Sequence, residues 1–193
     1  GIVSSNHVHI ASPEKGVEAY ISGLSGTVGY KKNQSNFIVQ DEVLNGVFSL
    51  DSMRLIYGDD LFLNVSRLHL RSNTTLQTDS SSVTPLTTHA DCKIFNLRYN
   101  DHQWFKADDI EFHGGYKPSL NPQKKLEGAL VFRSHNIKYL DLESEDAFVM
   151  DDFDLIMEGN LSKNATDWQN LKSWEIKGML NANQSTLYFS DFP

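Results

Sequence analysis

The sequence lacks the features of disulfide-stabilised, cysteine-metal and membrane-spanning proteins. Its 193 residues contain one cysteine, Cys92, which excludes an intrachain disulfide and any metal cluster built from cysteines. The longest uninterrupted apolar run covers residues 128–132, far below the roughly 18 residues that a membrane-spanning helix needs. Mean hydropathy is -0.40, so the composition is that of a soluble chain.

Positive charge is also scarce. Lys and Arg total 17 against 25 Asp and Glu, which gives a net charge of -8 at pH 7. Because nucleic acids and anionic lipid surfaces are recognised through a positive field, this balance argues against both as electrostatic partners. Hydrophobic residues make up 39% of the chain, so we expect one β-rich domain over residues 1–193 with a core that is thin for this length.

Short catalytic and cofactor motifs are missing as well. The chain has no Walker sequence and no GxSxG elbow, and the GxxGxxG spacing that starts at Gly23 is not the dinucleotide fingerprint. Among seven histidines, only His7 and His9 share a strand face at a spacing that a metal could use, and no third ligand can be named. Cys92 lies in a predicted strand with Lys93 as its one basic neighbour, which favours an unreactive thiol. We therefore expect no catalytic residue, no metal and no cofactor.

Three acidic pairs, at 59–60, 108–109 and 151–152, lie at recurring turn and bulge positions of the chain. A calcium loop needs several oxygen ligands around a sharp glycine turn, and catalytic carboxylates need one member with a perturbed pKa in a cleft. The sequence around these pairs shows neither context. Aspartate is favoured where the backbone turns or bulges, so we expect structural roles for all three pairs.

What the sequence does contain is an internal repeat of about 42 residues. Residues 53–70 align with residues 95–112 at a shift of 42, and the second copy aligns with a third at a shift of 43. Apolar positions match apolar positions throughout: Leu63 meets Phe105, and Phe105 meets Phe148. A repeat of this length predicts one supersecondary unit used several times. The copies cover about 49–72, 91–113 and 134–158, with a partial fourth at 178–193 that favours a fragment of a longer protein.

Each copy has the same internal order of residue types. Apolar residues alternate with polar ones, turn formers follow at 58–60, 100–102 and 143–146, and alternation resumes, which predicts strand, tight turn, strand. Two polar residues instead of one then separate Val65 from Leu68, which shifts the alternation by one residue. The later copies contain the same shift, or slip, at the equivalent position. Because side chains alternate between the faces of a strand, a bulge or bend must absorb the extra residue. A bend at the same place in every copy predicts a curved sheet.

The predicted fold class is all-β and mainly antiparallel. We expect a curved, twisted sheet of successive hairpins, arranged either as an open trough or as a sandwich. One segment, residues 166–174, favours a short helix near Trp168, because Trp168, Leu171 and Trp174 recur at three-residue spacing after a capping residue.

One face of the predicted sheet carries a continuous apolar stripe, with Phe62 and Trp104 on the other face. Aligning the second and third copies at a shift of 43 places Leu97 on Leu140 and Tyr99 on Leu142. A curved apolar face can close against a second layer or hold an apolar ligand. On the second alternative the ligand-binding residues are Leu55, Tyr57, Leu63, Leu97, Tyr99, Phe105, Leu142 and Phe148.

The repeated unit resembles the β-rich periplasmic regions of Gram-negative envelope proteins, the AsmA/TamB-like group and the YdgA-like proteins of unknown function. The residues that carry the resemblance are LSGTVGY at 24–30, LNGVFSLDSMRLIYGDDLFLNVSRLHL at 44–70 and the later copies. The resemblance implies a periplasmic protein anchored in the inner membrane, a twisted sheet folded into an apolar trough, and a role in outer-membrane lipid or protein homeostasis.

Two functional hypotheses follow. The first is a non-enzymatic envelope module whose apolar sheet face binds lipid acyl chains or a partner protein. The alternative is an extracellular domain that binds carbohydrate or a surface through exposed aromatic residues and sequon-bearing loops. An enzyme ranks third, because no set of residues can be assigned acid, base and nucleophile roles together. Unpaired edges of an open sheet would also favour self-association.

Overall fold

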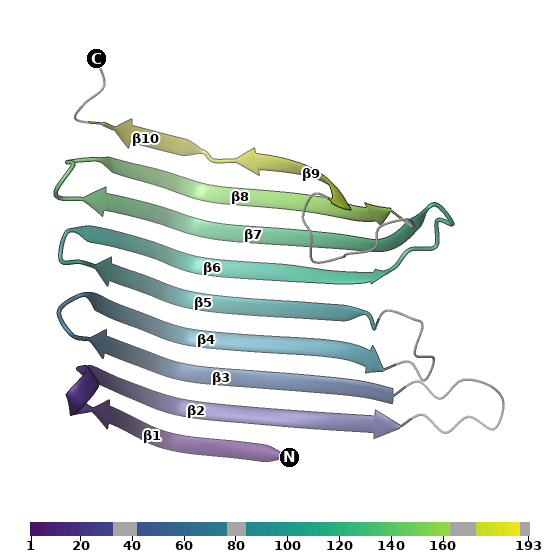
Figure 1. Ribbon diagram of the computed structural model, residues 1–193, viewed down its shortest axis with the longest axis horizontal. Coiled ribbons are helices and arrows are strands. Elements are labelled where there is room, and N and C mark those ends of the chain that lie inside the picture. The colour runs from purple at the N-terminus through teal and green to yellow at the C-terminus, as the bar shows by residue number, and fades with distance from the viewer. Residues whose placement is uncertain (33–41, 77–83, 163–172, 190–193) are drawn as a thin grey trace.

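The chain forms a single antiparallel β-sheet, described here from a computed structural model that covers residues 1–32, 42–76, 84–162 and 173–189 (Figure 1). The strands follow one another in chain order across the sheet from β1 to β8, and β9 and β10 share the far side of β8. The all-β, antiparallel prediction is confirmed. The strands are β1 (Ile2–Ser12), β2 (Val17–Lys32), β3 (Glu42–Tyr57), β4 (Leu61–Leu76), β5 (Leu86–Tyr99), β6 (Gln103–Pro118), β7 (Lys124–Asp141), β8 (Ala147–Ser162), β9 (Trp174–Asn181) and β10 (Gln184–Tyr188), with a 3-10 turn, η1 (Pro13–Lys15), between β1 and β2.

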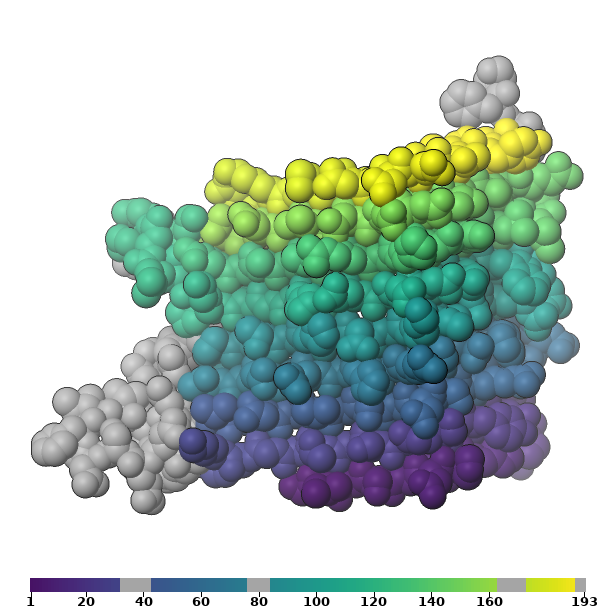
Figure 2. Space-filling model, turned by 180° about the vertical axis from the view of Figure 1, so that it is seen from behind, coloured from purple at the N-terminus to yellow at the C-terminus, as the bar shows by residue number. Residues whose placement is uncertain are grey.

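The sheet is a single layer. Extensive contacts join only elements that are neighbours in the sheet, and over the described ranges no element packs on either face. Figure 2 shows one face as a continuous surface on which the strands follow in order without a covering layer. The accessible surface is 13307 Å², against about 9,300 Å² for a compact protein of this mass. Of the two predicted arrangements, the structure is the open sheet and not the sandwich.

The hairpin turns lie where the repeat predicts them. Three residues connect β3 to β4 and β5 to β6, and residues 142–146 connect β7 to β8. Gly58, Asn100 and Asp101 adopt positive φ in these turns, a conformation that glycine and asparagine tolerate well. Backbone hydrogen bonds of 2.7 to 2.9 Å join each turn to the next one, so the ladder of the sheet continues into its turns.

Strands β1 to β8 bend at one level (Figure 1). The regular pairing there skips one position, or two between β2 and β3 and between β6 and β7. One skipped residue of each strand lies at the centre of this level, and we call these residues the bend row. On β2, β4, β6 and β8 this residue has a φ between 49° and 62°. A residue in that conformation leaves two consecutive side chains on the same face, which is the slip that the sequence predicts. From β1 to β8 the bend row is Asn6, Gly23, Asp51, Arg67, Lys93, Asp109, His135 and Asp152.

The two faces of the sheet differ in character. We call the face that carries Leu63, Val65, Leu68 and Leu70 of β4 the apolar face, and the opposite side the polar face. The buried side chains of the middle of the sheet all belong to the apolar face and lie in the rows that flank the bend row. Burial there shows that the sheet bends toward its apolar face, which forms a shallow trough. These side chains are Leu50, Val65, Cys92, Ala107, Ser134 and Ile137.

One detail of the predicted organisation differs from the structure. The partial fourth copy matches Leu187 to Phe148 as equivalent positions, but the two residues are antiparallel partners on β10 and β8. Strands β9 and β10 therefore occupy the place of the first strand of a hairpin, because each neighbouring strand must reverse direction. Of the predicted helix at 166–174, residues up to 172 lie outside the described part, and Trp174 begins β9.

Replacing Gly23 by alanine tests the bend. Gly23 has a φ of 62°, and a Cβ atom there would lie 2.2 Å from Oδ2 and 2.9 Å from Cβ of Asp51. We expect Gly23→Ala to lower the free energy of unfolding by about 2 kcal/mol, since strain and a clash are both introduced. Urea denaturation followed by circular dichroism measures the change.

Gly46→Ala on the neighbouring strand β3 is the matched control, because a Cβ atom at Gly46 meets nothing within 4 Å and its φ is unstrained. This control is expected to be neutral or to stabilise by up to about 1 kcal/mol. Equal losses from both substitutions would show that the bend does not depend on Gly23.

Candidate functional site

Seven of the eight predicted ligand-binding residues lie on the apolar face. Cross-strand pairing places Leu55 opposite Leu63, Leu63 opposite Leu97, and Leu97 opposite Phe105. Phe148 continues the same row on β8. The next row toward the turns contains both tyrosines, Tyr57 and Tyr99, on either side of Leu61. The structure thus brings these seven side chains together in two adjacent rows.

The eighth residue, Leu142, does not belong to this surface. It lies in the connection between β7 and β8 and is 55% exposed. Tyr139 takes the expected place in the row, where it pairs with Phe105 on one side and Phe148 on the other. Leu140 pairs with Trp104 and so faces the polar side. The predicted alignment was wrong by one residue, because β7 keeps the 42-residue shift and the longer turn after it carries the extra residue.

Aromatic rings order the apolar face on both sides of the bend. The rings of Tyr139 and Phe148 stack with centroids 5.4 Å apart. Edge-to-face pairs join Phe95 to Phe105 at 6.0 Å and Phe132 to Phe153 at 5.9 Å. Such pairs contribute about 0.5–1.5 kcal/mol each beyond the area they bury. The apolar face is therefore held in a defined arrangement even though no second layer covers it.

A hollow interrupts the apolar face near β9, and we call it the apolar groove. Its volume is about 390 Å³, and glycines form part of its floor. A Cβ atom on Gly114 would lie 2.7 Å from the Phe112 ring, and one on Gly159 would lie 3.1 Å from the Trp174 ring. The two rings therefore lie directly over glycine backbone. The apolar side chains around the groove are Leu86, Phe112, Leu130, Met157, Trp174 and Ile176.

Sequence reasoning missed the apolar groove. The signal was present in the glycines, because Gly128 and Gly159 are direct partners on β7 and β8 and Gly114 lies on the adjacent strand. Only the strand register shows that these glycines share a face, since they are far apart in the sequence.

Polar side chains of the bend row pair with each other on the polar face. Lys93 forms an ion pair with Asp109, and Nδ1 of His135 lies 2.7 Å from Oδ1 of Asp152. Nδ2 of Asn183 donates to Oδ2 of Asp152 at 2.7 Å. These contacts cross from strand to strand along the bend. The acidic pairs at 108–109 and 151–152 lie at this bend, and 59–60 lies in a turn, as predicted.

Phe62 and Trp104 lie on the polar face, which confirms their predicted separation from the apolar stripe. The guanidinium carbon of Arg98 is 5.8 Å from the centroid of each ring, and that of Arg54 is 5.2 Å from the Phe62 ring. Trp104 remains 47% exposed. These stacked cations and rings make a second ordered surface near the turns.

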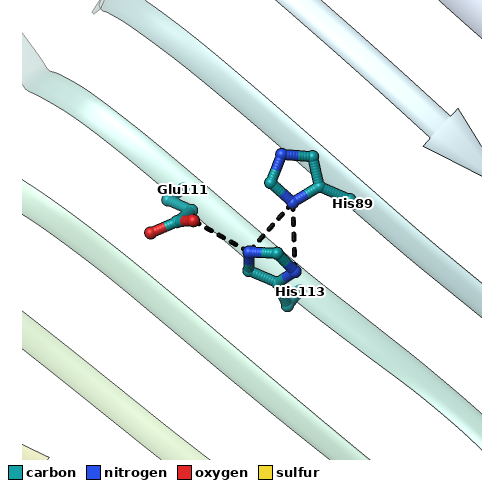
Figure 3. A group of neighbouring side chains, drawn as sticks. All are labelled: His89, Glu111 and His113. Carbon is teal, nitrogen blue, oxygen red and sulfur yellow. Dashed lines mark hydrogen bonds and ion pairs between the residues drawn. The ribbon is translucent and has the colours of Figure 1, made fainter.

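Two histidines from neighbouring strands meet on the polar face with a glutamate beside them (Figure 3). His89 of β5 and His113 of β6 are direct partners, and Nδ1 of His89 lies 2.9 Å from Nε2 of His113. Oε1 of Glu111 accepts a hydrogen bond from Nε2 of His113 at 2.8 Å. The pKa of Glu111 is lowered below its ordinary value, mainly by this hydrogen bond from His113. We call these three residues the histidine cluster.

The two histidines whose spacing stands out in the sequence, His7 and His9, belong to another strand. His9 lies 3.1 Å from the Glu18 carboxylate and stacks on the Tyr20 ring at 4.4 Å, and it belongs to no cluster of three ligands over the described ranges. The position of the β5–β6 turn is the signal that was missed. In an antiparallel hairpin the numbers of two paired residues have a constant sum, which is 202 here, as for Leu97 and Phe105. Because both strands skip a position at the bend, the same sum applies beyond it and places His89 opposite His113.

Cys92 is buried on the apolar face beside the bend. Its Sγ atom lies 3.2 Å from the carbonyl oxygen of Ile94 and 3.6 Å from that of Ser66. Burial raises the pKa of the thiol, which keeps it protonated at neutral pH. Its surroundings agree with the unreactive thiol expected from the sequence.

Comparison of the chain with protein-family models, with curated proteins and with solved structures finds no match in any of the three. None of the helical residues in the described ranges forms a segment long and apolar enough to cross a membrane.

The His135–Asp152 pair predicts a pH-dependent contribution at the bend. The hydrogen bond to Asp152 raises the pKa of His135, and the bond from His135 lowers the pKa of Asp152. Stability from a raised histidine pKa is fully present below the unfolded value and is lost as pH rises through the folded value. Stability from the lowered aspartate pKa is present above its unfolded value and is lost as pH falls through the folded value. The pair is therefore strongest between about pH 4 and pH 6.5.

Titration of the imidazole signals by nuclear magnetic resonance measures this effect. Asp152→Asn should bring the pKa of His135 down toward the ordinary histidine value, because the largest cause of the shift is removed. Asp59→Asn, in the β3–β4 turn, is the control and should leave it unchanged. An unaltered His135 pKa in Asp152→Asn would contradict the pairing.

Proposed function

We propose that the protein is a non-enzymatic envelope module whose apolar sheet face binds the acyl chains of lipids. The observation that carries this proposal is the uncovered trough. A continuous apolar surface is folded along the bend row, which crosses the sheet from β1 to β8, and over the described ranges no second layer lies on it. Water would otherwise contact rows of leucine, phenylalanine and tyrosine side chains.

The extent of exposure supports a binding surface. The accessible surface exceeds that of a compact protein of this mass by about 4,000 Å². Contiguous exposed apolar patches on soluble monomers rarely exceed a few hundred Å², and larger ones mark interaction sites. Large hydrophobic residues of this face that remain more than a third exposed include Val28, Tyr57, Leu70, Tyr99, Leu180 and Leu187.

The shape and chemistry of the surface favour acyl chains over a polar ligand. The bend runs across all the strands from β1 to β8, so the trough is open at both edges of the sheet. The apolar groove adds a hollow walled by Phe112, Met157 and Trp174. A flexible hydrocarbon chain can follow such a surface because it needs apolar contact and no specific hydrogen bonds.

The cellular setting in this proposal comes from the resemblance to AsmA/TamB-like and YdgA-like proteins. It assigns the module to the periplasm, anchored in the inner membrane as part of its full-length protein, with a role in outer-membrane lipid homeostasis. A partner protein could bind the same apolar face. Self-association would instead use the unpaired backbone groups of the open edges at β1 and at β9 and β10.

Carbohydrate binding is supported by less of the structure. Its best support is Trp104, which is 47% exposed on the polar face. A sugar ring would have to stack on that indole, but the Arg98 guanidinium already lies 5.8 Å from its centroid. Binding there would leave the apolar face uncovered.

A pair of adjacent substitutions tests acyl-chain binding. Met157 lines the apolar groove, whereas its neighbour Ile156 faces the polar side and pairs with Val131 and Met179. We expect Met157→Gln to weaken binding of a fluorescent fatty acid roughly five- to ten-fold, because a large part of one apolar side chain is lost from the contact. Ile156→Gln should leave the affinity unchanged.

The titration uses protein from which co-purified lipid has first been extracted and identified by mass spectrometry. Co-purified phospholipid or fatty acid, together with the Met157 effect, supports the proposal. Protein that carries no lipid and binds no fatty acid contradicts it. A dimer that Met157→Gln dissociates, without any lipid bound, would assign the face to a second copy of the chain instead.

A further inference from the structure

We propose that the histidine cluster on the polar face is a binding site for a divalent transition-metal ion, with Zn²⁺ as the reference ion. The ligands are the imidazoles of His89 and His113 and the carboxylate of Glu111 (Figure 3). The site lies on the opposite side of the sheet from the apolar trough, so it does not depend on lipid binding.

Three potential ligand atoms already converge in the structure. Nδ1 of His89 is 2.9 Å from Nε2 of His113, and Oε1 of Glu111 is 2.8 Å from that same Nε2. Imidazole nitrogen and carboxylate oxygen bind zinc at about 2.0–2.2 Å in tetrahedral geometry, which sets neighbouring ligand atoms about 3.3 Å apart. The two atoms that contact Nε2 of His113 each need to move about half an ångström away from it, and all three ligand atoms already lie within 4.8 Å of one another.

The sheet fixes the positions of the ligands. His89 and His113 are direct cross-strand partners on β5 and β6, and Glu111 is two residues from His113 on the same face. Side chains in such positions project from a rigid, hydrogen-bonded backbone, so little order has to be gained on binding. Two imidazoles and one carboxylate are a ligand set found in zinc sites that retain an open position.

Outer contacts orient two of the ligands. Nε2 of His89 faces Oδ1 of Asp91 at 3.4 Å, which leaves Nδ1 toward the centre of the cluster. A carboxylate behind a ligating histidine is the usual second contact at zinc sites. On the other side of the cluster, Arg133 lies 3.5 Å from Oε2 of Glu111 and 2.7 Å from Oδ1 of Asp154. Arg133 is thus anchored by Asp154 and holds the Glu111 carboxylate, whose Oε1 atom contacts His113.

The histidine cluster borders a wide depression of about 750 Å³ on the polar face. His89 and His113 form part of its wall, and Arg71, Lys117 and Lys124 line it as well. Water would fill the open positions of a bound zinc ion. The three side chains are between a third and a half exposed, so an ion can reach them without any movement of the strands.

Zinc competition with a chromophoric chelator tests the site, using the untagged full chain so that no other histidines are added. We expect one equivalent of Zn²⁺ to bind with micromolar affinity. His89→Ala or His113→Ala should weaken binding at least ten-fold, and Glu111→Gln should weaken it by several-fold, because each removes one ligand. Zn²⁺ should also raise the thermal unfolding midpoint of the native chain and not that of His89→Ala.

The matched control is the double variant His7→Ala, His9→Ala, which removes two histidines of another strand and should leave the affinity unchanged. If His89→Ala fails to fold, His113→Gln and zinc-induced shifts of the His89 and His113 ring signals in the native protein take its place. The proposal is overturned if the native chain binds no zinc, if the His89 and His113 signals do not respond to it, or if only the control variant loses binding.

Discussion

The backbone hydrogen-bond ladder is the constraint on which the rest of the structure depends. In a single-layer sheet each strand is held only by its two neighbours, so a bend in one strand must be matched in the next or the ladder breaks. The bend row meets this requirement at the same level from Asn6 to Asp152, with positive φ on every second strand. A repeated slip in the sequence thus becomes a straight fold line across the sheet.

The bend gives the two faces different roles. On its inner side Val65, Ala107 and Ile137 are buried, and the rows farther from the fold line remain partly exposed, which makes the trough. On its outer side the bend gathers charged and hydrogen-bonding groups such as Lys93, Asp109 and His135. Stability then comes from the ladder and from cross-strand rows more than from a closed core. A ligand that covers the trough would increase the stability of the folded protein, because a ligand that binds the folded state alone shifts the folding equilibrium toward it.

The repeat alone predicts the hairpins, their turns and the bend, because these depend on local residue order and on the two faces of a strand. The repeat does not distinguish an open trough from a sandwich, since the same apolar stripe fits both arrangements. Residue-level errors arose where the copies differ: Tyr139 and not Leu140 continues the stripe, because the turn at 142–146 has the longer connection. The histidine cluster and the apolar groove need strand register, which periodicity within one strand does not reveal.

Small-angle X-ray scattering of the monomer tests the open, single-layer sheet most directly. Nine strand positions about 4.8 Å apart and strands of about 16 residues make a plate of roughly 50 by 40 Å and one sheet thick, with a radius of gyration of about 19 Å. A compact domain of 193 residues has a radius of gyration of about 16 Å. A thin, plate-like profile near 19 Å is the predicted result. A globular profile near 16 Å would mean that the apolar face is closed inside the protein, and would contradict the account.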